Sequence, residues 1–208
     1  GFRFSKSLGQ NFLINPSICP RMAEACGADK GTGVLEIGPG IGVLTHELAK
    51  RSPHVVSVEI DKRLLPILNE TLSDYKNVKI IHADALKIDL SDLIKQEFSG
   101  MRVSICANLP YYITSPMLMR LLESRLSVDS ITVMVQKEAA LRLCAKPGTR
   151  QCGAVTLAVW YYAIPEMLFQ VSRGSFIPSP NVDSAVIRLN IRKKPACLVK
   201  NEKTLFRI

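Results

Sequence analysis

Residues 34–42 read VLEIGPGIG, and the amphipathic stretch VLTHELAKR follows at once at residues 43–51. An apolar run that ends in closely spaced glycines and continues as an amphipathic stretch predicts a strand, a sharp turn and a helix. Glycines such as Gly38 and Gly40 let the backbone turn, and they let a ligand lie against it without a Cβ in the way. We therefore expect a strand of an α/β fold here, with a nucleotide-type ligand at its carboxyl end.

On both sides of this turn, short apolar, β-branched runs alternate with longer amphipathic ones. Such alternation predicts an α/β fold with a mostly parallel, Rossmann-like sheet of about seven strands and helices on both faces. The expected strands are residues 33–37, 55–59, 78–82, 103–107, 131–136, 164–171 and 185–191. The expected helices are residues 16–26, 43–51, 63–73, 91–98, 115–124 and 137–144. We also expect the aromatic residues 160–162 to pack a helix on the sheet.

The length of 208 residues allows one ordinary domain, or one domain and part of another. With 47% hydrophobic and 22% charged residues, the composition is typical of a folded globular chain and excludes a disordered one. We expect residues 1–191 to form one domain. Residues 192–208 are expected to be a linker and the first turns of a second domain.

The net charge of +9 is unevenly distributed along the chain. Residues 1–100 carry 12 basic and 12 acidic side chains, whereas residues 101–208 carry 15 and 6. Clustered lysines and arginines bind polyanions by releasing counterions from phosphates. The second half is therefore expected to face a polyanionic partner, and the other explanation is a surface that only keeps the protein soluble.

The cysteines and histidines indicate neither a metal site nor a disulfide framework. Six cysteines are scattered without a CxxC pair, and three histidines show no ligand spacing. No run of 18 apolar residues is present, and the first residues lack the apolar core of a signal peptide. We expect reduced thiols, no metal, no membrane association and a cytoplasmic protein, with an organellar matrix or stroma left open.

Three acidic residues accompany the glycine turn in sequence. Glu36 precedes the first glycine, Glu59 ends the second expected strand, and Asp84 follows the third in the segment HADAL. Carboxylates repel phosphate and suit a cationic ligand, so NAD is a poor fit. S-adenosylmethionine has a ribose, an adenine, an ammonium and a sulfonium but no phosphate, and it is the expected cofactor. Glu59 is placed to accept the ribose hydroxyls, and Asp84 to meet the adenine amine.

The segment Asn108-Leu109-Pro110-Tyr111 follows the fourth expected strand. The lone pair of an exocyclic amine such as adenine N6 is delocalised into the ring and points at no electrophile. Carbonyl acceptors from the Asn108 side chain and the Leu109 backbone, fixed by Pro110, can hold the amine hydrogens and turn the lone pair towards a methyl group. Tyr111 can stack on the base once it is unpaired or flipped out.

Six motifs in this order together resemble one enzyme family. They are FSKSLGQNFL (residues 4–13), EIGPGIGVLT (36–45), VEID (58–61), HADAL (82–86), ANLPYYITSP (107–116) and FIPSPNVDS (176–184). The chain closely resembles the KsgA (RsmA) type of ribosomal RNA small-subunit adenine N6-dimethyltransferase over residues 2–191. The resemblance implies a class I S-adenosylmethionine-dependent methyltransferase fold. It also implies methyl transfer to N6 of two adjacent adenosines in the 3′-terminal hairpin of small-subunit ribosomal RNA, during ribosome biogenesis.

The resemblance also implies roles for single residues. Asn11 and Leu13 would touch the cofactor, with Gly38 and Gly40 beneath it. Asn108 would bridge cofactor and target base.

On the same resemblance, Phe176 would cover the face of the target adenine opposite Tyr111. Residues 1–191 would be the catalytic domain, and residues 192–208 the linker and start of a truncated C-terminal helical RNA-binding domain. The implied partner is the immature small ribosomal subunit, and the protein would be a monomer.

Three alternatives remain open from sequence. The Erm type of methyltransferase modifies one adenosine of large-subunit RNA and shares the cofactor motifs. A non-catalytic RNA-binding, assembly or transcription factor of the same fold is the second, and a dual role is compatible with catalysis. DNA adenine methylation is the third, although the leading Asn108 and the lack of a target-recognition insertion disfavour it.

Overall fold

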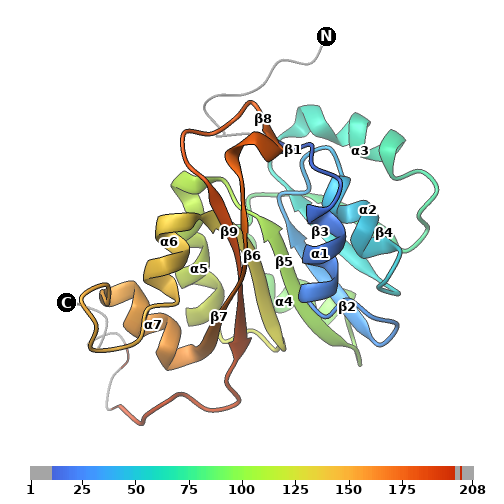
Figure 1. Cartoon of the computed structure of the whole chain (residues 1–208). Coiled ribbons are helices and arrows are strands. Elements are labelled where there is room, and N and C mark those ends of the chain that lie inside the picture. Colours follow the sequence, from blue (N-terminus) through green and yellow to red (C-terminus); the bar gives the residue numbers. More distant parts are fainter. Residues whose placement is uncertain (1–10, 200–201, 203–208) are drawn as a thin grey trace.

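The computed structural model describes residues 11–199 and residue 202, so the motif residues 4–10 lie outside the described part. The chain forms a seven-stranded sheet covered by helices on both faces, and a separate two-stranded sheet (Figure 1). The strands of the large sheet are β2 (Thr32–Ile37), β3 (Val55–Glu59), β4 (Val78–His82), β5 (Arg102–Asn108), β6 (Ser130–Gln136), β7 (Ala163–Val171) and β9 (Ser184–Ile191). The small sheet pairs β1 (Phe12–Leu13) with β8 (Phe176–Ile177).

The helices connect these strands in the expected alternation. The α-helices are α1 (Ile18–Ala25), α2 (Val43–Ala49), α3 (Leu65–Thr71), α4 (Leu90–Glu97), α5 (Thr114–Glu123), α6 (Lys137–Leu143) and α7 (Ala154–Tyr162). The described residues also form three short 3₁₀ turns: η2 (Lys62–Leu64), η3 (Tyr111–Ile113) and η4 (Arg173–Ser175). All seven predicted strands are confirmed, with ends that differ by at most one residue, and the six predicted helices are confirmed to within two residues.

The sheet has the strand order β4-β3-β2-β5-β6-β9-β7. The first five strands of this order pair in parallel, and β9 runs antiparallel between β6 and β7. The carboxyl ends of the five parallel strands therefore meet at one edge. The strand order reverses between β2 and β5, and such a switch point leaves a crevice at the carboxyl edge where ligands bind.

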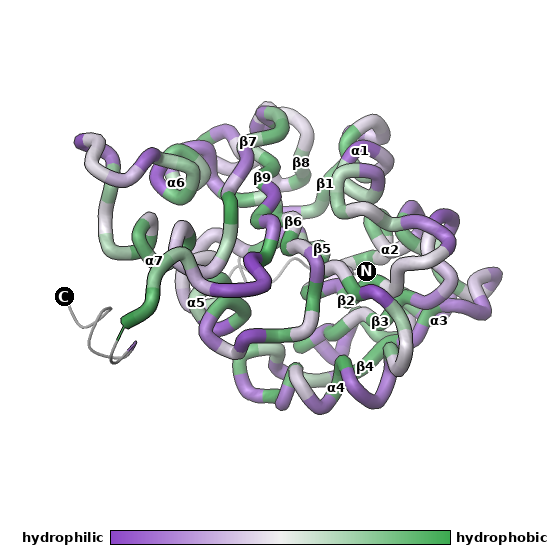
Figure 2. Tube along the Cα trace, turned by 90° about the horizontal axis from the view of Figure 1, so that it is seen from below, coloured by the Kyte–Doolittle hydropathy of each residue, from purple (hydrophilic) through white to green (hydrophobic). Residues whose placement is uncertain are grey.

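Each face of the sheet has its own hydrophobic core, because successive side chains of a strand point to opposite sides. Leu35 of β2 and Ile105 of β5 pack with α4, α5, α6 and α7. Val34 and Cys106, their chain neighbours, pack with α1 and α2 on the other face. Hydrophilic and hydrophobic residues alternate along the covering helices, as amphipathic packing requires (Figure 2).

The aromatic end of α7 lies where it was expected. Tyr161 and Tyr162 are buried in the core on the α5 face of the sheet, and the Trp160 indole N–H donates to the Ala145 carbonyl over 2.8 Å. The Tyr161 and Tyr162 hydroxyls both donate to the Glu202 carboxylate, over 3.0 and 3.1 Å. Residues 192–199 contain no helix or strand, whereas most of the predicted start of a second domain lies outside the described residues.

None of the helices in the described part of the chain combines the length and apolar composition that a bilayer crossing requires.

Gly33 in β2 provides a test of this packing. A Cβ at Gly33 would lie 2.4 Å from Cδ1 of the buried Phe98 ring at the end of α4. Gly33→Ala should destabilise the fold by about 1–3 kcal/mol, because the ring has to shift within a filled core. Gly31→Ala is the matched control, since its Cβ would meet only Asp29 Oδ1 at 3.5 Å. Urea unfolding of both variants measures the difference, and equal stability would contradict the packing at Gly33.

Candidate active site

A cavity of about 310 Å³ opens at the carboxyl edge of the sheet, at the switch point between β2 and β5. Its walls come from the segments that follow β2, β3, β4 and β5, together with β1, α1 and β8. Glu36 apart, every residue that the sequence analysis assigned to the cofactor or to catalysis lines this cavity. These residues are Asn11, Leu13, Gly38, Gly40, Glu59, Asp84, Asn108, Leu109, Pro110, Tyr111 and Phe176.

The glycine turn forms one wall of the cavity. Gly38 has φ of +71°, and a Cβ added to it would meet no atom within 4 Å, so its open side is available to a ligand. Gly40 has φ of +61°, and its added Cβ would lie 3.3 Å from the Phe12 ring of β1. The lack of a side chain at Gly40 therefore allows β1 to approach closely, in addition to allowing the turn.

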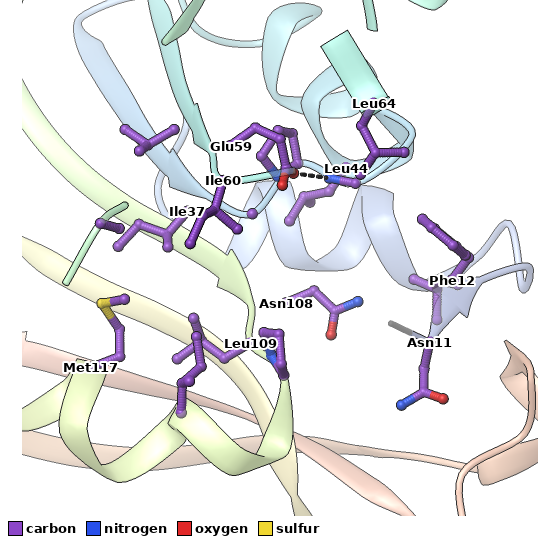
Figure 3. A pocket seen from close by; sticks show the side chains of 18 of the residues that line it. Asn11, Phe12, Ile37, Leu44, Glu59, Ile60, Leu64, Asn108, Leu109 and Met117 are labelled. Atoms are coloured by element: carbon purple, nitrogen blue, oxygen red, sulfur yellow. Dashed lines mark hydrogen bonds between the residues drawn. The ribbon is translucent and has the colours of Figure 1, made fainter. Parts of the chain in front are cut away.

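Glu59 is fixed against this turn by two backbone hydrogen bonds. The Gly40 N–H donates to Oε2 over 3.2 Å (Figure 3). The Asp61 N–H donates to Oε1 over 2.8 Å. Burial raises the pKa of the Glu59 carboxyl, and the two N–H donors act in the opposite direction. Each carboxylate oxygen can accept a further hydrogen bond, so this group has the capacity to bind a diol.

Glu59 and Asp84 are the charged residues among the described residues that line the cavity. Asp84 follows β4, accepts the Leu86 N–H over 2.9 Å and lies 3.4 Å from the Lys87 ammonium. With neither lysine nor arginine in the described lining, the cavity has no group to neutralise a phosphate. The two carboxylates therefore fit a ligand that is cationic, as S-adenosylmethionine is.

The expectation that Glu36 belongs to this acidic set is wrong. Its side chain is buried beneath the turn, where Oε2 accepts the hydroxyls of Thr45 in α2 and Ser57 in β3, each over 2.7 Å. Burial raises the pKa of the Glu36 carboxyl to about 7, against the lowering effect of the two hydroxyls. Glu36 thus ties β2 to α2 and β3 and does not line the cavity, since side chains alternate between the faces of a strand.

Asn108 ends β5, and its side chain lines the cavity (Figure 3). Among residues 11–199 and 202, its side-chain amide has no hydrogen-bond partner, although the residue is half-buried. A half-buried amide without a partner is unfavourable unless a ligand or water completes its bonds. Pro110 follows with φ of −55° and ψ of 135°, and this extended residue turns the chain into η3.

Tyr111 and Phe176 approach the cavity from distant parts of the chain. Tyr111 is half-buried in η3, and its hydroxyl lies 2.7 Å from the Ser184 hydroxyl. Phe176 is buried in β8, which pairs with β1 through Leu13 opposite Phe176. The Ile14 N–H donates to the Ser175 carbonyl over 2.8 Å and extends this contact. The small sheet therefore brings Asn11, Leu13 and Phe176 to one side of the cavity.

Sequence reasoning missed most of the apolar wall. Phe12, Leu44, Ile60, Tyr112 and Met117 also line the cavity. Phe12 and Ile60 are the chain neighbours of Asn11 and Glu59. This adjacency is the one sequence signal that could have identified them as cavity residues. Nothing in the pattern of α5 distinguishes Met117 from an ordinary core residue.

The described residues contain no group of three or more His, Cys, Asp or Glu side chains that could hold a metal ion. The site instead consists of a glycine turn, two acids, an amide without a partner among the described residues, and aromatic rings in one largely apolar cavity. The fold and this site define a class I S-adenosylmethionine-dependent methyltransferase.

Comparison with known proteins narrows the class. The ribosomal RNA adenine dimethylase family matches the chain over residues 1–208, and the chain belongs to this family. It is 52% identical to the ribosomal RNA small subunit methyltransferase A of Anoxybacillus flavithermus and 51% identical to that of Shouchella clausii. In both comparisons the whole chain aligns with 71% of the relative.

Solved structures agree with this assignment. The 23S rRNA methyltransferase ErmE matches with a TM-score of 0.78 and 33% identity, over 91% of this chain and 73% of that one. A dimethyladenosine transferase from Plasmodium falciparum matches with a TM-score of 0.76 and 30% identity, over 88% of this chain and 64% of that one.

The buried Glu36 carboxyl makes a prediction about stability. The pKa of Glu36 is raised in the folded state, from an ordinary 4.5 to about 7, so its contribution to stability is present below pH 4.5 and decreases as the pH rises to 7. Relative to wild type, Glu36→Gln should therefore become more stable by up to about 3 kcal/mol over this interval, because glutamine does not ionise.

Denaturant unfolding at a series of pH values measures this difference, with Glu70→Gln on the exposed face of α3 as the control. A difference between Glu36→Gln and wild type that stays constant with pH would contradict the buried, neutral carboxyl.

Proposed function

We propose that this chain transfers methyl groups from S-adenosylmethionine to N6 of two adjacent adenosines in the 3′-terminal hairpin of small-subunit ribosomal RNA. The observation that carries the proposal is the half-buried Asn108 amide, which has no partner among the described residues and lies in one cavity with the glycine turn, Tyr111 and Phe176. The curated relatives, at about half identity, are small-subunit enzymes, and this supports the choice of RNA.

The cofactor would lie along the glycine turn. Glu59 would accept hydrogen bonds from the ribose hydroxyls, and Asp84 would accept one from the adenine amine. Gly38 would leave room for the cofactor to lie against the turn. Asn11 and Leu13 of the N-terminal strand would close the cavity from the other side. When bound, S-adenosylmethionine supplies a methyl group on a positively charged sulfonium.

The chain's own residues would prepare the target amine. The Asn108 carboxamide oxygen and the Leu109 carbonyl would accept the two N6 hydrogens, which turns the lone pair out of conjugation with the ring. Tyr111 and Phe176 would hold the base between two aromatic faces, a contact worth about 1–3 kcal/mol per base for single-stranded substrates. Positioning would supply most of the rate, since the methylated amine is acidic and needs no strong base.

Basic groups at the site edge suit an RNA substrate. Lys137 begins α6 directly after β6, and exposed Arg173 begins η4 with one residue between it and β7, so both lie at the carboxyl edge of the sheet. They would contact the phosphates that flank the target base. The immature small subunit as partner, a monomeric state and a cytoplasmic location remain part of the proposal.

The substrate test offers the protein two RNAs. Unmethylated small ribosomal subunits and bare large-subunit RNA are incubated with S-adenosylmethionine, and mass spectrometry of the digested RNA locates the methyl groups. We expect dimethyladenosine at two adjacent positions near the 3′ end of the small-subunit RNA. Methylation of large-subunit RNA alone would instead favour a 23S rRNA methyltransferase activity such as that of ErmE.

Asn108→Ala tests the assignment of the amide. The variant should keep its affinity for S-adenosylmethionine, because the glycine turn and Glu59 are untouched. Methyl transfer should fall by roughly 100-fold or more, because the amine is no longer oriented for attack. Calorimetry and radiolabel transfer measure the two quantities, with Asn69→Ala on exposed α3 as the control. Transfer near the wild-type rate would show that Asn108 is not the orienting group.

A further inference from the structure

The Tyr111 hydroxyl and the Ser184 hydroxyl form a hydrogen bond of 2.7 Å between two segments that are 73 residues apart in the chain. Tyr111 belongs to the turn after β5, and Ser184 is the first residue of β9. The Ser184 side chain is completely buried. A hydrogen bond to a buried hydroxyl across such a separation fixes where the hydroxyl end of the tyrosine ring lies.

Ser184 is itself held rigidly. Its Cα pairs with Gln136 of β6 on one side and with Val171 of β7 on the other. The preceding carbonyl, of Asp183, accepts the Lys137 N–H over 2.9 Å. Ser184 is therefore a fixed point of the sheet, and its hydroxyl has a defined place at the carboxyl edge.

The loop that carries Phe176 begins and ends at the same fixed point. It leaves the sheet after Val171 and returns at Ser184, and the Arg173 N–H donates to the Asp183 carboxylate over 3.0 Å across its two ends. The Ser179 hydroxyl also donates to the Arg173 carbonyl over 3.0 Å. Ser184 therefore helps to position two of the aromatic residues of the site. Tyr111 is linked to it through its hydroxyl, and Phe176 through this closed loop.

We propose that Ser184 is a positioning residue, which holds the Tyr111 ring in the orientation that stacks on the target base opposite Phe176. The inference rests on the proposed function for the identity of the base. Burial raises the pKa of the Tyr111 phenol, so the hydroxyl stays protonated at neutral pH and the contact is one between two neutral groups. Its contribution does not depend on pH in this range.

A double-mutant cycle tests the contact during catalysis. Ser184→Ala and Tyr111→Phe each remove one hydroxyl and keep the ring. Each should lower kcat for RNA methylation by roughly 3- to 10-fold, the range of a neutral hydrogen bond, with little change in KM for S-adenosylmethionine. The double variant should be no slower than either single variant, because the same contact is lost in all three.

Ser130→Ala is the matched control. Ser130 is also buried, and its hydroxyl contacts Ser104 over 3.3 Å and the Cys26 carbonyl over 3.4 Å. This variant should leave kcat unchanged, and thermal unfolding of all variants shows whether any of them is only destabilised. If the losses of Ser184→Ala and Tyr111→Phe multiply in the double variant, Ser184 does not act through Tyr111.

A second readout needs no RNA. With 3-fluorotyrosine incorporated, the fluorine resonance that Tyr111→Phe removes identifies Tyr111. Ser184→Ala should shift and narrow this resonance as the ring is released, and Ser130→Ala should not. An unshifted resonance would overturn the proposal. A shifted resonance in a protein that methylates no small-subunit RNA would contradict the proposed function instead, and it would leave the contact established.

Discussion

The parallel pairing of β2 with β3 on one side and with β5 on the other is the constraint on which the site depends. Because the three strands run the same way, the turn after β2, Glu59 and Asn108 all reach one edge of the sheet. The connections from β2 lead to β3 on one side, and the chain later returns to place β5 on the other. The cavity is the crevice that opens where the chain runs to opposite sides of β2, so the strand order itself creates it.

The charges follow from this geometry. The cavity contains two acids and, among the described residues, no basic group, so it favours a cation. Basic side chains such as Lys137 and Arg173 lie outside it, at the same edge. The basic residues of the second half do not all lie at this edge, because β9 runs away from it. Arg192 follows β9 at the far end of the sheet, where it bonds to the Trp160 and Ala163 carbonyls.

Most of the large sheet was predictable because buried parallel strands are apolar runs with glycine, acid or proline at their ends. Gly38, Glu59, Asp84 and Asn108 stand at or just after the ends of these runs, which places them at the carboxyl edge of a parallel sheet. Glu36 shows the limit of the rule. An acid near a ligand turn in sequence can point to the opposite face of the strand, and only its bonds to Thr45 and Ser57 reveal this.

The small sheet was beyond sequence reasoning for a different reason. β1 and β8 contain two residues each, too few to show a period of two. The approach of Leu13 to Phe176 is a tertiary contact between distant segments. Asn11, Leu13 and Phe176 were identified as site residues through the resemblance to a family, whereas composition and spacing gave no sign of them.

The pairing of β1 with β8 joins the beginning of the described chain to a segment far along it, and the Asn15 side chain bonds to Ser175 across 160 residues. During synthesis the N-terminal strand therefore has no partner until nearly the whole domain has left the ribosome. A cofactor that binds between both strands can bind only the native state, and it stabilises that state by mass action. Contacts of such long range also slow folding. Because β1 and β8 both line the cavity, its wall is complete only once this contact has formed.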